Sequence, residues 1–200
     1  LPETFQVMDS GDQLRVIKRL LNTLNFDDKQ WPPKEMQWYI NAQKEEGIRA
    51  RHSAETGDIY DRQRLRIYRA YEELCERSGL VDFAELLLRA HELLRDNPAV
   101  LDFYQQRFRQ VHVDEFQDTD PLQAEVVLYL CEASATAKRA GDVQLAAGKL
   151  TIVGDPKQSI YRFRRADIAM YAEVCERIRS GPVCEAQLSV NFRSAVSILD

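Results

Sequence analysis

The sequence predicts a mixed α/β protein in which an all-α region precedes part of a parallel-sheet core. Over residues 1–108, apolar side chains recur at helical spacing, and Asp and Pro residues stand where helices would begin. From Arg109 onward, short apolar runs alternate with helical patterns, which is typical of βα units around a parallel sheet. We therefore expect a helical subdomain at 1–105 and a sheet-containing domain at 106–200, with the boundary between 95 and 110.

Local start and stop signals locate the helices of the first half. Acidic or Pro residues precede each apolar-periodic stretch, and Gly79 is suited to end a long helix. The first expected helix begins after Asp12 and carries Leu14 to Leu24, and the second runs from near Pro33 to about residue 48. A third, long helix follows a polar loop at 50–58 and closes at Ser78-Gly79. Two more helices are expected to begin after Asp82 and at Pro98.

The second half is expected to alternate strands with helices. The apolar runs predict strands at 110–113, 149–153 and about 185–188, and the periodic stretches predict helices at about 121–132, 167–179 and from about 194. The small and polar stretch 133–149 is expected to form a surface loop or a frayed helix end.

Composition excludes some classes of protein. Of the 200 residues, 44% are hydrophobic and 30% are charged, as in soluble globular proteins, and no apolar run approaches the about 20 residues that span a membrane. The net charge of −5 argues against a uniformly basic nucleic-acid binder. Local basic clusters remain, at Arg62, Arg64, Arg66 and Arg69 and at Arg162, Arg164 and Arg165.

The cysteines and histidines show no metal-ligand spacing. Cys75, Cys131, Cys175 and Cys184 form no C-x-x-C pair, so we expect buried free thiols in a reducing compartment and a cytoplasmic protein. The three histidines, His52, His91 and His112, have no partner pattern and are expected to be structural or exposed.

The run VHVDEFQDTD, residues 111–120, places Asp114 and Glu115 directly after a short β-branched strand. Ligands of parallel sheets bind at the carboxyl ends of the strands. One Asp there can anchor Mg²⁺ on a nucleotide, and a neighbouring Glu can polarise a water for attack on the γ-phosphate. Taken alone, the pattern fits a solvated acidic turn equally well.

Three stretches together resemble a known family. DEFQDTD (114–120) resembles motif II of superfamily 1 helicases of the UvrD/Rep and RecB/AddA type, TIVGDPKQSIYRFRRAD (151–167) resembles motif III, and LSVNFRS (188–194) resembles motif IV, in the family's order. In the helical half, QWPPKEMQWYINAQKEEG (30–47) and LVDFAELLLRAHELL (80–94) resemble the accessory helical subdomain of UvrD-type helicases. The resemblance covers essentially the whole chain.

This resemblance implies a partial RecA-like P-loop NTPase core, preceded by the all-α subdomain. The implied activity is that of an ATP-dependent DNA helicase or translocase of 3′-to-5′ polarity in DNA repair or recombination. The implied cofactors are ATP and Mg²⁺. Single-stranded DNA and single-strand/duplex junctions are the implied substrates, with repair or nuclease subunits as further partners and no membrane. The alternatives are the motor of a helicase–nuclease and a non-enzymatic DNA-binding module with remnant motor motifs.

The resemblance also implies roles for residues near the nucleotide. Asp114 would hold Mg²⁺, Glu115 would orient or activate the hydrolytic water, and Gln158 would sense the γ-phosphate. Arg193 would stabilise charge on the γ-phosphate, and Phe192 would stack on the adenine, unless Phe192 is ordinary core. Gln158 alternatively serves as a turn amide.

On the DNA side, Tyr161, Phe163 and Arg164 are the implied contacts. Aromatic faces stack on bases whatever their identity, and Arg meets phosphates. Tyr161 is alternatively a core residue, and the segment is alternatively an Arg-rich solvated turn.

The remaining polar residues of motif II have plainer interpretations. Gln117 is expected to hydrogen-bond within the turn or to be a surface amide. Asp118 and Asp120 are expected to cap the helix that opens at Pro121, and capping is favoured for Asp120.

The sequence departs from the family pattern in two places. Pro156-Lys157 and Arg162–Arg165 make motif III closer to the RecB/AddA branch, whereas the first half is UvrD-like. No G-x-x-x-x-G-K-[ST] run occurs in the 200 residues, since Gly148-Lys149 is followed by Leu150. We therefore expect the phosphate cradle to lie before Leu1, and this stretch alone to hydrolyse ATP negligibly.

Overall fold

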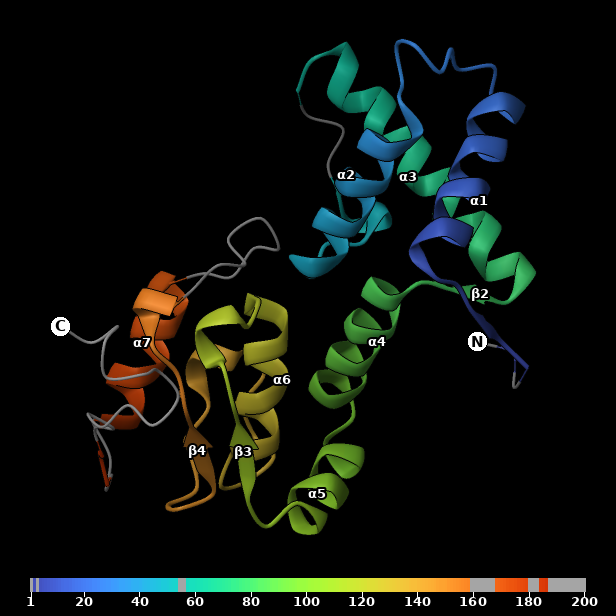
Figure 1. Ribbon diagram of the computed structural model, residues 1–200. Coiled ribbons are helices and arrows are strands. Elements are labelled where there is room, and N and C mark those ends of the chain that lie inside the picture. Colours follow the sequence, from blue (N-terminus) through green and yellow to red (C-terminus); the bar gives the residue numbers. More distant parts are fainter. Residues whose placement is uncertain (1, 3, 54–56, 159–167, 180–183, 187–200) are drawn as a thin grey trace, which may run out of the picture.

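The computed structural model describes residues 2, 4–53, 57–158, 168–179 and 184–186. In Figure 1, one group of elements contains α1 to α3 with β1 and β2, and a second contains α4 to α7 with β3 and β4. The helices are α1 Ser10–Thr23, α2 Pro33–Glu45, α3 Ile59–Ser78, α4 Phe83–Asp96, α5 Pro98–Arg107, α6 Pro121–Cys131 and α7 Ile168–Arg179. The strands are β1 Gln6–Val7, β2 Leu80–Val81, β3 Val111–Val113 and β4 Leu150–Ile152.

The helix start expected at Asp82 is confirmed, since Asp82 caps α4 by accepting a hydrogen bond from the Glu85 N–H. Asp9 and Asp58 cap α1 and α3 in the same way, although the sequence did not single them out, and α1 begins at Ser10 rather than after Asp12. Gly79 ends α3 in the left-handed conformation at φ 63°, which glycine adopts without steric cost. Pro98 opens α5 as expected.

Other expectations were wrong in detail. The region before residue 109 also contains β1 and β2, which pair in parallel, and two-residue strands are too short to leave a periodic pattern. The expected loop at 50–58 begins with a 3₁₀ turn, Ala50–His52. Residues 184–186 have no regular structure where the strand 185–188 was expected. Residues 187–188 of that strand, and the helix expected from 194, lie outside the described residues.

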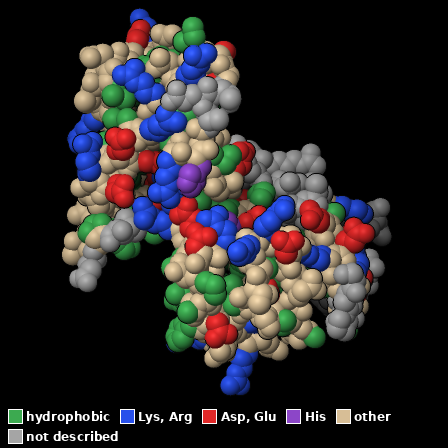
Figure 2. All heavy atoms as spheres, turned by 180° about the vertical axis from the view of Figure 1, so that it is seen from behind, with side chains coloured by type: hydrophobic (Ala, Val, Ile, Leu, Met, Phe, Trp, Pro, Cys, Tyr) green, Lys and Arg blue, Asp and Glu red, His purple; other side chains and the backbone are tan. Residues whose placement is uncertain are grey.

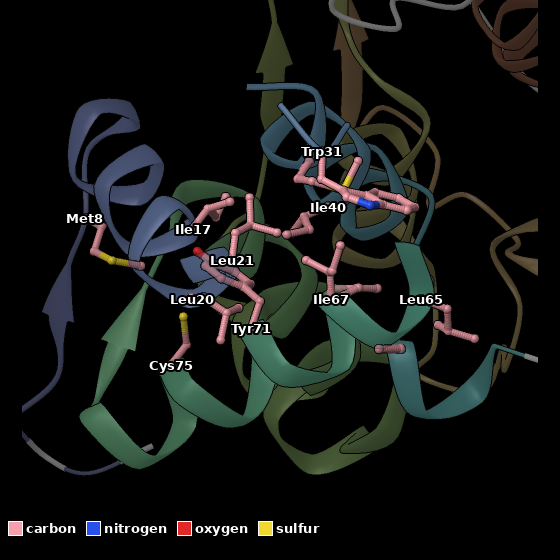
Figure 3. Packing of buried hydrophobic residues seen from close by; sticks show 13 residues of the cluster. Met8, Ile17, Leu20, Leu21, Trp31, Ile40, Leu65, Ile67, Tyr71 and Cys75 are labelled. Atoms are coloured by element: carbon pink, nitrogen blue, oxygen red, sulfur yellow. The ribbon is translucent and has the colours of Figure 1, made fainter. Parts of the chain in front are cut away.

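A first hydrophobic core lies among α1, α2 and α3 (Figure 3). Ile17, Leu21, Ile40 and Tyr71 are completely buried there, and they come from all three helices. Trp31 closes one end, with its ring stacked on Tyr60 at a centroid distance of 4.5 Å. Because each helix buries one apolar face against the other two, none of these faces would be stable alone.

A second core surrounds β3, β4 and α6. Leu94 of α4 and Leu101 of α5 pack there with Phe116, Leu128 and other buried side chains. Helix α4 is also joined to α6 by a polar contact, since His91 Nε2 lies 2.6 Å from Glu125 Oε2. The buried His91 therefore has a partner that the sequence pattern did not show.

A buried ionic network holds α4 against α2 and the segment that follows it. Lys44 Nζ lies 2.7 Å from Asp82 Oδ2 and 3.0 Å from Glu85 Oε2. Arg49 Nη1 lies 2.7 Å from Glu85 Oε1, and Arg49 Nη2 lies 2.7 Å from Glu92 Oε2. The side chains of Lys44 and Asp82 are 2% and 4% exposed, so little solvent screens this pair.

We expect the stability of the protein to fall in acid because of this network. Burial would raise the pKa of Glu85, but Lys44 and Arg49 outweigh burial and hold the pKa below its ordinary value of 4.5. The unfolded chain then binds more protons, so this stabilisation is present above about pH 4.5 and is lost as the pH falls through the native pKa. Urea unfolding across that range measures it. The acid-dependent loss should shrink in Glu85→Gln, and parallel curves would contradict the assignment.

Two of the four cysteines are fully buried, as expected, and the other two are not. All four are free, with Cys75 and Cys131 buried, Cys175 half-buried and Cys184 exposed. Burial raises the pKa of both the Cys75 and the Cys131 thiols to about 11, so these two stay protonated at neutral pH.

Basic and acidic side chains intermingle over the face seen in Figure 2. The arginines of α3 mostly contact neighbouring groups: Arg64 lies 4.4 Å from the Tyr60 ring centroid, and Arg66 lies 5.7 Å from that of Phe26. Arg62, Arg66 and Arg69 also line a surface hollow of about 400 Å³. Within the described residues, no helix is long and apolar enough to cross a membrane.

Candidate active site

The parallel pair β3–β4 brings motifs II and III to one edge. The register pairs Val111 with Leu150 and Val113 with Ile152. Since both strands run in the same direction, their carboxyl ends lie side by side, as the two arrows in Figure 1 show. Asp114 follows one strand, and the loop from Val153 follows the other, so residues far apart in the chain share the edge where ligands of parallel sheets bind.

The acid pair is turned outward by a strained backbone. Glu115 has φ 50° and ψ 39°, in the left-handed region, which costs a non-glycine residue about 1–3 kcal/mol. The next residue, Phe116, donates its N–H to the Val153 carbonyl at 3.0 Å and buries its ring. The turn therefore anchors Phe116 in the core and leaves Asp114 and Glu115 exposed at the edge.

Gln117 connects the two motifs. It is 5% exposed, so the interpretation as a surface amide was wrong. Its Oε1 accepts a hydrogen bond from the backbone N–H of Asp155 at 3.1 Å, across to the loop after β4. Within its own turn, Gln117 Nε2 lies 3.5 Å from Asp118 Oδ2. The closer contact is thus between motifs rather than within motif II.

Gln158 lies in the 3₁₀ turn Pro156–Gln158, on the same loop. Its Nε2 donates to Asp155 Oδ2 at 3.1 Å, and the Lys157 N–H donates to Asp155 Oδ1 at 2.9 Å. The Lys157 N–H and the Gln158 amide lower the pKa of Asp155, so this carboxyl is ionised at neutral pH. Gln158 is exposed, at the edge that also carries the acid pair.

Asp120 caps α6, as expected. Its side chain accepts from the Gln123 N–H at 2.8 Å, and the Gln123 side chain accepts from the Asp120 N–H at 3.3 Å. Burial raises the pKa of Asp120. Asp118 does not share this role, because the helix begins after Asp120.

The acid pair offers carboxylate oxygens, the ligand type that magnesium takes in proteins. Within the residues that the structure describes, no group of three or more His, Cys, Asp or Glu side chains could hold a metal ion. Magnesium keeps several waters and is usually bound through one or two carboxylates together with substrate phosphates. Asp114 and Glu115 place two such carboxylates, both exposed, at the strand end.

The other expected site residues lie outside the described residues. These are Tyr161, Phe163, Arg164, Phe192 and Arg193. Their roles remain predictions. Among the described residues, the sequence patterns missed Asp155 and Tyr171, whose hydroxyl donates to the Gly154 carbonyl at 3.2 Å.

Known proteins resemble this chain over most or all of its length. Residues 1–178 match the family model described as UvrD/REP helicase N-terminal domain. The chain is 44% identical to DNA helicase II of Escherichia coli over 200 residues, covering 100% of the chain and 26% of that relative. It is 42% identical to DNA helicase II of Haemophilus influenzae over 200 residues, 25% of that relative. It is 34% identical to the ATP-dependent DNA helicase PcrA of Bacillus subtilis over 196 residues, covering 98% of the chain and 24% of that relative.

Proposed function

Since the chain belongs to the UvrD/REP helicase family, we propose that it forms part of an ATP-dependent DNA helicase or translocase. The chain spans about a quarter of the length of the relatives it matches, so the activity belongs to the intact protein. The observation that carries the proposal is the exposed pair Asp114-Glu115 beside the Asp155–Gln158 loop, at the carboxyl edge of parallel strands.

In this proposal, the residues at the carboxyl edge of β3 and β4 have separate roles in nucleotide hydrolysis. Bound Mg²⁺ would neutralise charge on the phosphates and would be held by Asp114. Glu115 orients the attacking water and accepts its proton. Gln158 contacts the γ-phosphate, Arg193 stabilises the charge that develops there, and Phe192 stacks on the adenine. An amide nitrogen carries two hydrogens, so Gln158 can donate to Asp155 and to a phosphate oxygen together.

On the DNA side, we assign Tyr161, Phe163 and Arg164 to the strand. The substrates in this proposal are single-stranded DNA and its junctions with duplex. The protein moves along the strand with 3′-to-5′ polarity and acts in repair or recombination in the cytoplasm. Residues 1–105 would be the accessory helical subdomain, and 106–200 part of the RecA-like motor. The hydrophobic cores divide the chain earlier than residue 105, because Leu94 of α4 and Leu101 of α5 pack in the core around β3, β4 and α6.

A specific sequence feature favours a second candidate. Pro156-Lys157 in motif III resembles the RecB/AddA branch, in which the motor belongs to a helicase–nuclease. Repair or nuclease subunits would then be partners. Degradation of DNA by the intact protein, in step with ATP hydrolysis, would distinguish this candidate from a helicase alone.

The proposal predicts ATP hydrolysis that DNA stimulates. We expect the intact protein to hydrolyse ATP faster when single-stranded DNA is added, and the 200-residue chain alone to hydrolyse ATP negligibly, because these residues contain no G-x-x-x-x-G-K-[ST] run. Phosphate release with and without DNA measures both. An intact protein that binds DNA but never hydrolyses ATP would instead support a non-enzymatic binding module.

A further inference from the structure

The loop after β4 approaches motif II unusually closely at Gly154. A Cβ at this position would lie 2.6 Å from Gln117 Oε1 and 3.1 Å from the Tyr171 ring. Real Cβ atoms do not approach an oxygen so closely, so the absence of a side chain at Gly154 is what admits the Gln117 amide.

The same loop is held by two groups. The Gln117 oxygen accepts from the Asp155 N–H at 3.1 Å, and the Tyr171 hydroxyl of α7 donates to the Gly154 carbonyl at 3.2 Å. The Tyr171 ring also lies 5.8 Å from the ring of Phe116, the residue just before Gln117. The loop is therefore held beside the motif II turn by hydrogen bonds to backbone atoms of the loop, which do not depend on the side chains of the loop.

These contacts form a short path between the two catalytic elements. Gln117 stands two residues after Glu115, and the Asp155 that it holds binds the Gln158 amide at 3.1 Å. Within the described residues, the backbone hydrogen bonds between the two loops, Phe116 N–H to Val153 O and Val153 N–H to Val113 O, lie before Gly154.

We propose that Gln117 is a positioning residue, which keeps the Asp155–Gln158 turn at its working separation from Asp114 and Glu115. The role of Gln117 rests on the proposed function, because it sets the geometry of that same site. Gln117 acts through Asp155 and does not touch the nucleotide. Errors of about 1 Å in such a geometry can lower a rate about 100-fold without preventing binding.

The first test is Gln117→Leu in the intact protein, which removes the acceptor oxygen at similar volume. We expect kcat for DNA-stimulated ATP hydrolysis to fall about 10- to 100-fold, with KM for ATP nearly unchanged. Hydrogen exchange in peptides covering 153–158 should accelerate, because the Asp155 N–H loses its acceptor. The matched control is Gln106→Leu on α5, an exposed amide that donates to Asp102, and it should change neither quantity.

Two further variants keep the test decisive if Gln117→Leu folds poorly. Gln117→Glu retains an oxygen at the same reach, so it should retain more of kcat than Leu does. Gly154→Ala should lower kcat strongly in the wild-type background and much less in Gln117→Ala, where the oxygen that its Cβ meets is gone.

The outcomes separate the two proposals. A wild-type protein that hydrolyses ATP, with unchanged kcat or unchanged exchange in Gln117→Leu, refutes the role of Gln117 alone. An equal loss in Gln117→Glu and Gln117→Leu, with additive effects of Gly154→Ala, refutes it as well. A correctly folded wild-type protein that never hydrolyses ATP refutes the proposed function itself.

Discussion

Replacing Glu115 by Gln should abolish ATP turnover in the intact protein while sparing ATP binding. The substitution keeps the size of the side chain but removes the carboxylate that we propose accepts the proton of the attacking water. General-base catalysis contributes about 10²- to 10⁴-fold, so kcat should fall by about that factor. Because Asp114, the proposed metal ligand, is unchanged, nucleotide affinity should stay close to that of the wild type.

Single-turnover hydrolysis and equilibrium binding of a fluorescent nucleotide measure the two quantities separately. The matched control is Glu76→Gln, an exposed carboxylate on α3, which should leave both unchanged. Wild-type turnover in Glu115→Gln would show that another group activates the water. A parallel loss of ATP affinity would assign Glu115 to binding rather than to proton transfer.

Replacing Lys44 by Met should cause a large loss of stability. Met preserves most of the side-chain volume but removes the ammonium that lies 2.7 Å from Asp82 and 3.0 Å from Glu85. Asp82 and Glu85 would then remain buried together without the Lys44 ammonium. Removing one partner of a buried ion pair typically costs about 3–5 kcal/mol, most of it because the other charge is left uncompensated.

The matched control is Lys18→Met on α1, where the lysine is exposed. It should change the free energy of unfolding by less than about 0.5 kcal/mol. Urea unfolding of both variants at neutral pH makes the comparison. A loss below about 1 kcal/mol in Lys44→Met would show that water or a neighbouring group compensates Asp82 and Glu85.

The local features of this protein could be read directly from its residues. The Asp82 cap acts on a backbone group within one turn, and Gly79 acts on the helix that it ends. The acid pair could also be predicted from the sequence, because Asp114 and Glu115 directly follow their strand. Each of these features depends on residues a few positions away, so the local amino-acid sequence determines it.

Other features depend on partners that are distant in the chain. The surface-amide interpretation of Gln117 failed because its acceptor oxygen faces Asp155, on the strand-end loop beside it. His91 showed no partner pattern because Glu125 belongs to another helix. Strands β1 and β2 went unnoticed because each has only two residues and pairs with a distant part of the chain.

The sequence by itself therefore determined where helices begin, which strand carries the acid pair and which family the motifs resemble. Only the tertiary structure decided which charges are buried together and how motif III is held beside motif II. The physical reason is that caps and strand-end residues act within a turn, whereas Lys44 with Asp82, or Gln117 with Asp155, meet only after packing brings distant elements together. Periodicity shows which face of an element is buried, but not what that face will meet.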